Sequence, residues 1–145
     1  MPSRQEQFWT QHAYAFVGHS AKRSFPRISY GEAKKRGKRV FPVDPSATEI
    51  EGDRTFADLG ALPEKIDGVV IEVPPAETAG WVARAAAAGV RQVWIHAGCE
   101  TPEALEIARR EGLEVITGHC AVMYLSQGLS VHAIHRWLVR RAGKY

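Results

Sequence analysis

The chain has 145 residues, 45% of them hydrophobic, which is enough for one domain with a core and too few for two domains of ordinary size. Its formal charge is only +3, from 19 basic and 16 acidic residues. This balance gives no reason to expect a nucleic-acid partner, and it suits a small polyanionic ligand equally well. Two cysteines, a polar N-terminus and the lack of a long apolar run predict a cytoplasmic protein without membrane contact.

The first strong pattern is an apolar run over residues 13–23 that breaks at a glycine and turns basic. It predicts a buried strand that ends in a tight turn at Gly18. If a helix follows, the main-chain N–H groups of the turn and the helix N-terminus form an anion site. Gly18 allows close approach of a ligand and a φ that other residues rarely adopt, and Ser20 offers a hydroxyl. A plain turn without a ligand remains the alternative, because two of the three glycines of the dinucleotide fingerprint are missing.

Strands and helices are predicted to alternate along the chain. Start signals at Ser24 and Pro26 and a stop at Gly37 bound a first helix. The near-continuous apolar run at 67–73 predicts a parallel strand that is covered on both faces. In the helix at 76–88, the expected core-facing residues are Ala79, Val82, Ala83, Ala86 and Ala87. The other expected elements inside the domain are strands at 40–45, 90–96 and 113–117 and a helix at 101–111. At the N-terminus we expect a short helix in 3–12, with Phe8 and Trp9 over the edge of the core. At the C-terminus we expect a helix with Val131, Ile134 and Leu138 on one face.

Short loops between strands and helices of about ten residues predict right-handed crossovers and a parallel sheet. The predicted fold class is α/β: a Rossmann-like, doubly wound parallel sheet in three α/β/α layers, with an extra C-terminal helix. We expect residues 1–145 to form a single domain, with residues 123–145 as an extension packed on it. Ligands of such sheets bind outside the carboxyl ends of the strands, where the strand order reverses. The turns at 18–20, 73–75 and 97–98 are expected to meet there.

The order of these turns resembles the stand-alone CoA-binding domain family, which is similar to the CoA-binding domain of the succinyl-CoA synthetase alpha subunit. The resemblance covers about residues 12–122. The segments that carry it are Val17-Gly18-x-Ser20, Phe41-Pro42-Val43-x-Pro45, Ile66-Asp67 before the strand ending Val73-Pro74-Pro75, and Trp94-Ile95-x-Ala97-Gly98. It implies a Rossmann-like domain that binds coenzyme A or an acyl-CoA, with the glycine turn near the phosphates.

The resemblance also implies which residues contact the ligand. They are Gly18, His19, Ser20, Pro42, Val43, Val73, Pro74, Pro75, Ala97 and Gly98. Lys22, Arg23 and Arg27 are added to this set because their positive charges follow the glycine turn. No catalytic residue is expected. Synthetases of this resemblance activate an acid with additional domains, for which this chain lacks the length. We therefore expect the chain to hold CoA or an acyl-CoA and either to deliver it to a partner enzyme or to respond to it.

Three other interpretations stay open. The chain could be an NAD(P)-binding oxidoreductase, in which Asp44 after the second strand would hold a ribose hydroxyl. The C-terminal extension could contact a second copy of the chain and form a homodimer. Cys99 lies at the expected crevice and could form a mixed disulfide with the thiol of CoA. No metal is expected, because the histidines and cysteines include no Cys-x-x-Cys pair.

Overall fold

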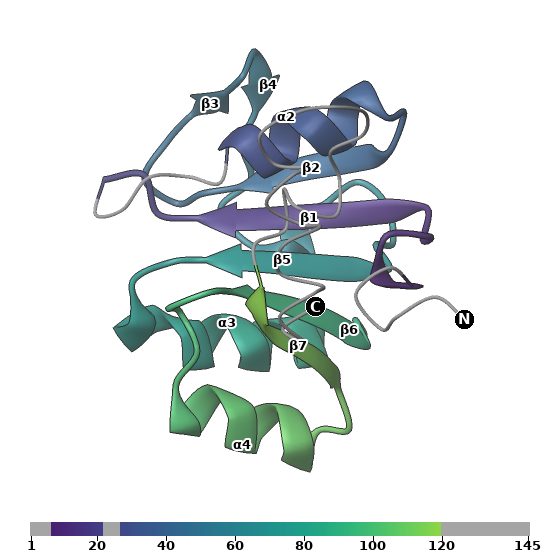
Figure 1. Ribbon diagram of the computed structural model, residues 1–145. Helices are drawn as coiled ribbons and strands as arrows, with labels where there is room; N and C mark the ends of the chain where they lie inside the picture. The colour runs from purple at the N-terminus through teal and green to yellow at the C-terminus, as the bar shows by residue number, and fades with distance from the viewer. Residues whose placement is uncertain (1–6, 22–26, 120–145) are drawn as a thin grey trace.

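The computed structural model describes residues 7–21 and 27–119, and a parallel sheet forms its centre (Figure 1). The sheet has five strands in the order β2-β1-β5-β6-β7. They are β1 (Ala13–Gly18), β2 (Arg39–Val43), β5 (Gly68–Glu72), β6 (Gln92–His96) and β7 (Glu114–His119). The order reverses between β1 and β5, which is the switch point of a doubly wound sheet.

Helices cover both faces of this sheet (Figure 1). The helix α2 (Arg27–Lys35) lies on one face, and α3 (Pro75–Ala87) and α4 (Pro102–Arg110) lie side by side on the other. A hairpin of β3 (Glu49–Ile50) and β4 (Asp53–Arg54) and a short 3-10 turn, η1 (Leu59–Ala61), connect β2 to β5. The predicted Rossmann-like three-layer fold is confirmed, whereas the predicted C-terminal helix lies outside the described residues.

Local sequence explains where these elements begin and end. All six residues of β1 are buried, because this strand lies between β2 and β5. The hydroxyl of Thr101 accepts a hydrogen bond from the N–H of Ala104, 3.1 Å away, and so caps α4. None of the described helices is long and apolar enough to cross a bilayer.

The buried face of α3 differs from the predicted one. Its core residues are Thr78, Trp81, Val82 and Ala85, whereas Ala83 and Ala87 are exposed. The prediction was right for Val82 and for Ala79, which is half-buried and packs against the core, and it was wrong for Ala83 and Ala87. Alanine is small enough to be tolerated on either face, so the large Trp81 side chain decides which way the helix turns.

The aromatic residues that precede β1 belong to the core and not to its edge. Phe8 and Trp9 are 1% and 7% exposed, and both rings pack against Tyr14 and Trp94. The hydroxyl of Tyr14 donates a hydrogen bond to the main-chain oxygen of Phe8 at 2.6 Å, which anchors this segment. A Cβ at Gly68 would lie 2.8 Å from the Phe8 ring, so glycine there lets the segment cover the sheet. On this face of the sheet, the residues before β1 thus cover the core in the place that a helix would otherwise occupy.

Candidate functional site

The carboxyl ends of the strands lie along one edge of the sheet, on the side to which the arrows point in Figure 1. The parallel register places Gly18 beside Glu72, Val17 beside Val43 and Ile71 beside Ile95. The predicted turns at 18–20, 73–75 and 97–98 and the predicted contact residues 42–43 at the end of β2 therefore lie at this edge, around the switch point. Of the three added cations, Lys22 and Arg23 lie outside the described residues, and Arg27 is the first residue of α2.

The predicted contact residues differ in how much of each residue is exposed to solvent. Val43 and Val73 are completely buried, so their side chains belong to the core and only their main chains can meet a ligand. Pro75 is exposed and occupies the first position of α3, where proline suits the helix start. Gly98 is also exposed, and its φ of +87° explains why glycine stands there.

Gly18 does not have the positive φ that the sequence suggested. It is the last residue of β1, it pairs with Glu72, and it is absent from the described glycines with positive φ. A conformational requirement for glycine is therefore not the reason for this residue. The reason for glycine that remains is steric, because the missing side chain leaves space at the end of the central strand.

A buried carboxylate holds the loop after β1 against the loop after β2. Asp44 is 1% exposed. Its Oδ2 accepts a hydrogen bond from the N–H of Ser20 at 2.9 Å. Its Oδ1 accepts two more from Ser46, from the N–H at 2.8 Å and from the hydroxyl at 2.6 Å. The N–H of Ala21 donates in turn to the Ser46 hydroxyl at 3.1 Å.

This network changes the expected anion site. The N–H groups of Ser20 and Ala21, which were expected to face a phosphate, already have acceptors within the protein. The hydroxyls of Ser20 and Ser46 lie 3.3 Å apart at the same place. Sequence reasoning missed Ser46, although Asp-Pro-Ser after a strand is a recognisable turn signal in which a side chain bonds the main chain two residues on.

The environment of Asp44 predicts a specific acid sensitivity. Burial raises the pKa of this carboxyl, but the hydrogen bonds from Ser46 and Ser20 outweigh burial and leave the pKa below its ordinary value. A carboxyl with a lowered folded pKa stabilises the fold above its unfolded pKa of about 4, and this stabilisation is lost as the pH falls through the folded value. We expect urea unfolding to show a steeper loss of unfolding free energy below about pH 4 in the parent than in Asp44→Asn. Equal slopes would contradict this role for Asp44.

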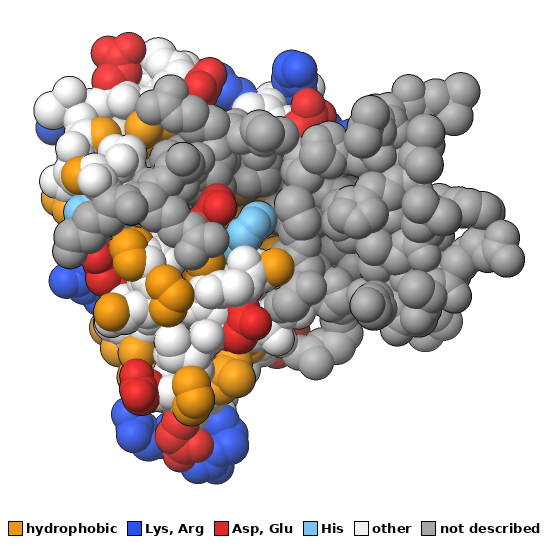
Figure 2. Space-filling model, turned by 60° about the vertical axis from the view of Figure 1, so that its left-hand side comes forward, with side chains coloured by type: hydrophobic (Ala, Val, Ile, Leu, Met, Phe, Trp, Pro, Cys, Tyr) orange, Lys and Arg blue, Asp and Glu red, His pale blue; other side chains and the backbone are white. Residues whose placement is uncertain are grey.

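Two histidine–carboxylate pairs lie at the same edge. In the first, Nδ1 of His19 is 2.8 Å and 3.0 Å from the two carboxylate oxygens of Glu77, which connects the glycine loop to the first turn of α3. In the second, Nε2 of His96 is 3.6 Å from Glu72 Oε1, across the β5–β6 pair. Figure 2 shows histidine and acidic side chains together among apolar ones on this side of the molecule.

Cys99 is not placed to react with a ligand. It is completely buried, and its main-chain oxygen accepts a hydrogen bond from the Thr78 hydroxyl at 2.7 Å. A mixed disulfide with the thiol of CoA would require the thiol of Cys99 to reach the surface. The structure therefore contradicts that interpretation, and the role of Cys99 is to fill the core between β6 and α4.

These observations define a doubly wound α/β domain, a class of fold in which ligands bind at the switch point of the sheet. Residues 12–136 match the family described as a CoA binding domain. The chain belongs to this CoA-binding domain family, and the resemblance seen in the turns is confirmed. Membership supports coenzyme A as the small-molecule ligand of the domain.

Solved structures show the same fold. A hypothetical protein from Pyrococcus horikoshii OT3 is 26% identical, with a TM-score of 0.75 over 83% of this chain and 86% of that one. A conserved hypothetical protein from Pyrococcus furiosus is 28% identical, with a TM-score of 0.68 over 77% and 97%. The dinucleotide forming acetyl-coenzyme A synthetase 1 of Ca. Korarchaeum cryptofilum, in complex with phosphate and ADP, is 26% identical, with a TM-score of 0.62 over 80% of this chain but 27% of that one.

Proposed function

We propose that the protein binds coenzyme A or an acyl-CoA in the crevice at the carboxyl edge of its sheet, without catalysis of its own. The observation that carries this proposal is the Asp44 network, which holds the loops after β1 and β2 in fixed positions beside the switch point. A preformed loop pair lowers the entropy lost when a flexible ligand binds. The proposed contacts are those of the family resemblance, from Gly18 to Gly98.

Positive side chains are required at this crevice because Asp44 places a negative charge behind the loop. The diphosphate and 3′-phosphate of CoA would be repelled by that charge unless cations compensate for it. Lys22, Arg23 and Arg27 follow the loop in the sequence, and we propose that they meet the phosphates. The hydroxyl of Ser20 is proposed as an uncharged donor, because the hydroxyl of Ser46 already donates to Asp44.

The position of Asp44 also favours CoA over NAD(P). Both of its carboxylate oxygens accept hydrogen bonds within the protein, and its side chain is buried. An acidic residue that selects the ribose of NAD must present its oxygens to the ligand. With Asp44 occupied in this way, the proposed oxidoreductase function has no ribose-binding carboxylate after β2.

The absence of catalysis is part of the proposal. The matched acetyl-coenzyme A synthetase contains the equivalent of this chain within about a quarter of its length. We propose that the present domain binds CoA and presents it to a partner enzyme or to a second copy of itself. Incubation of the purified chain with ATP, a carboxylic acid and CoA is then expected to yield no acyl-CoA, and ATP-dependent ligation would overturn this part.

Calorimetric titration tests the ligand. We expect CoA to bind more tightly than NAD under matched conditions, because CoA brings more negative charge to the basic segment. We also expect CoA affinity to fall as salt is raised, since exposed charges act through a screened field. Dephospho-CoA, which lacks the 3′-phosphate, is the matched control and should bind more weakly than CoA. Equal or tighter binding of NAD would show that the proposed ligand is wrong.

A further inference from the structure

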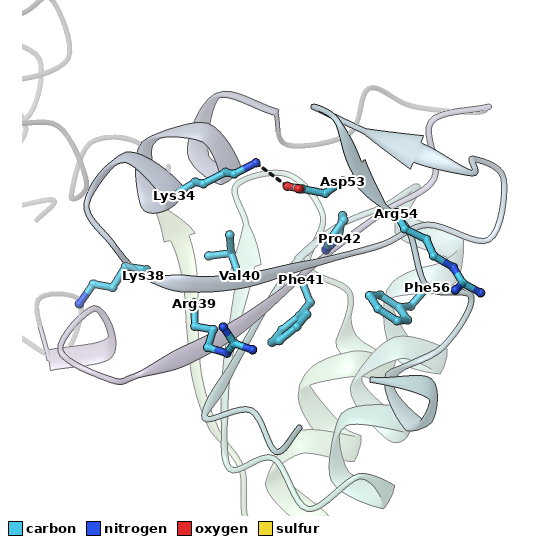
Figure 3. Close-up of a pocket in the computed structure, with 9 residues that line it drawn as sticks. All are labelled: Lys34, Lys38, Arg39, Val40, Phe41, Pro42, Asp53, Arg54 and Phe56. Carbon is cyan, nitrogen blue, oxygen red and sulfur yellow. Dashed lines mark hydrogen bonds and ion pairs between the residues drawn. The ribbon is translucent and has the colours of Figure 1, made fainter. Parts of the chain in front are cut away.

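A groove of about 370 Å³ runs along the outer edge of β2, on the far side of this strand from β1 (Figure 3). Its floor is apolar and consists of Val40, Phe41, Pro42 and Phe56. Val40 and Phe56 are half-buried, so part of each side chain remains available. The groove adjoins the CoA crevice at Pro42 but extends from there toward the beginning of β2, where none of the proposed CoA contacts lies.

The rim of this groove is basic. Four cationic side chains, Lys34, Lys38, Arg39 and Arg54, stand against one carboxylate, Asp53. Asp53 already bonds Lys34 at 2.7 Å and accepts a hydrogen bond from the Tyr30 hydroxyl.

Two of these four cations have no carboxylate partner within residues 7–21 and 27–119. Nε of Arg39 lies 2.6 Å from Oε1 of Glu64, a residue that does not line the groove. Among the described residues, no carboxylate pairs with Lys38 or Arg54. The groove therefore carries uncompensated positive charge above an apolar floor.

The main chain of β2 is open to a neighbour at one point of this groove. Arg39 donates its N–H to His12 on the β1 side at 3.3 Å, so by alternation the polar groups of Val40 point outward. Farther along, the outward C=O of Pro42 accepts from the N–H of Phe56 at 3.0 Å. The residue 56 segment thus covers the end of the edge strand, and in the described chain no strand lies beside Val40.

We infer that this groove binds an extended acidic segment of a partner protein. Its main chain would pair with Val40, as strands do when a peptide adds to a sheet edge. Its apolar side chains would cover Phe56, and its carboxylates would meet Lys38 and Arg54. This inference concerns a surface other than the CoA crevice and does not depend on which ligand the crevice holds.

Fluorescence anisotropy with two labelled peptides tests the inference. The first probe has about ten alternating Glu and Val residues, and the second has the same residues with a methyl group on every peptide nitrogen, which keeps the charge and the side chains and removes the N–H groups from both edges of the peptide. We expect the parent to bind the first probe at least about tenfold more tightly than the second, because only the first can pair with Val40. The double variant Lys38→Glu/Arg54→Glu should weaken binding of the first probe by at least about tenfold.

A matched variant controls for net charge. Arg91→Glu/Arg110→Glu makes the same change in charge on exposed positions away from the groove, and it should leave peptide binding unchanged. Both variants should keep the thermal transition of the parent, and CoA titration of the groove variant should remain close to that of the parent. Equal losses in the two double variants, or equal affinity for the two peptides, would overturn the inference. The inference would also be wrong if the groove bound ADP but not the peptide, and if Lys38→Glu/Arg54→Glu abolished the binding of ADP.

Discussion

Gly18→Val is expected to abolish CoA binding. Residues 14, 16 and 18 alternate onto the same face of β1, and Tyr14 and Phe16 belong to the core on the α2 side. A Cβ at position 18 would therefore project on the α2 face, where the chain leaves the sheet for the N-terminus of that helix. A branched side chain there would occupy the space through which we propose that the phosphates approach the helix N-terminus.

Two controls separate ligand exclusion from unfolding. Gly31→Val makes the same chemical change within α2, at a glycine whose Cβ would meet nothing within 4 Å, and it should leave CoA affinity nearly unchanged. Ser20→Ala removes one hydroxyl and should weaken binding by about 0.5–3 kcal/mol, depending on whether its partner is charged. Each variant must first show the thermal transition of the ligand-free parent. A folded Gly18→Val that binds CoA as well as the parent does would show that the phosphates lie elsewhere.

Asp44→Ala is expected to lower the free energy of unfolding by roughly 2–4 kcal/mol, because it leaves donors of Ser20 and Ser46 unsatisfied beside a buried cavity. It should also weaken CoA binding, since nothing then holds the loop after β1 against the loop after β2. Urea unfolding and calorimetric titration of the same variant measure the two effects.

The matched control for Asp44 is another aspartate. Asp58→Ala removes the same charge from an exposed position whose side chain makes no capping hydrogen bond, and it should change the unfolding free energy by no more than about 0.5 kcal/mol. Asp44→Asn keeps one oxygen acceptor and should lie between the two. If Asp44→Ala were as stable as Asp58→Ala, the buried network would not be what fixes these loops.

Most of the fold could be predicted because buried parallel strands and their turns are local patterns. The run before Gly18 is apolar without interruption and the run before Pro74 is interrupted only by Glu72, since both strands have neighbours on each side and layers on each face. The core face of α3 could not be predicted in the same way. Its alanines satisfy several helical faces equally well, and only packing against the sheet selects the face of Trp81.

The candidate site was predictable as a location but not as a set of contacts. Glycine and proline turns mark the carboxyl ends of β1, β5 and β6, and any parallel sheet brings such ends to one edge. The sequence marks Asp44 as an acidic residue after a strand, but it does not show which way the carboxylate points. A carboxylate that faces a ribose and one that faces a neighbouring loop have the same sequence signature, so only the folded loops distinguish them.

The order of the elements, the doubly wound class and the family can be predicted from local sequence, because hydrophobic periodicity and turn residues act over a few positions at a time. Which polar groups meet depends on how the chain folds. Ser20 and Asp44 are 24 positions apart and His19 and Glu77 are 58 apart, and each pair forms only because the strand order places its loops side by side. The basic groove beside β2 has the same origin: Lys38 and Arg54 face one hollow because the β3–β4 hairpin folds back over the edge strand. Contacts between distant segments depend on strand order and register, which local patterns do not encode.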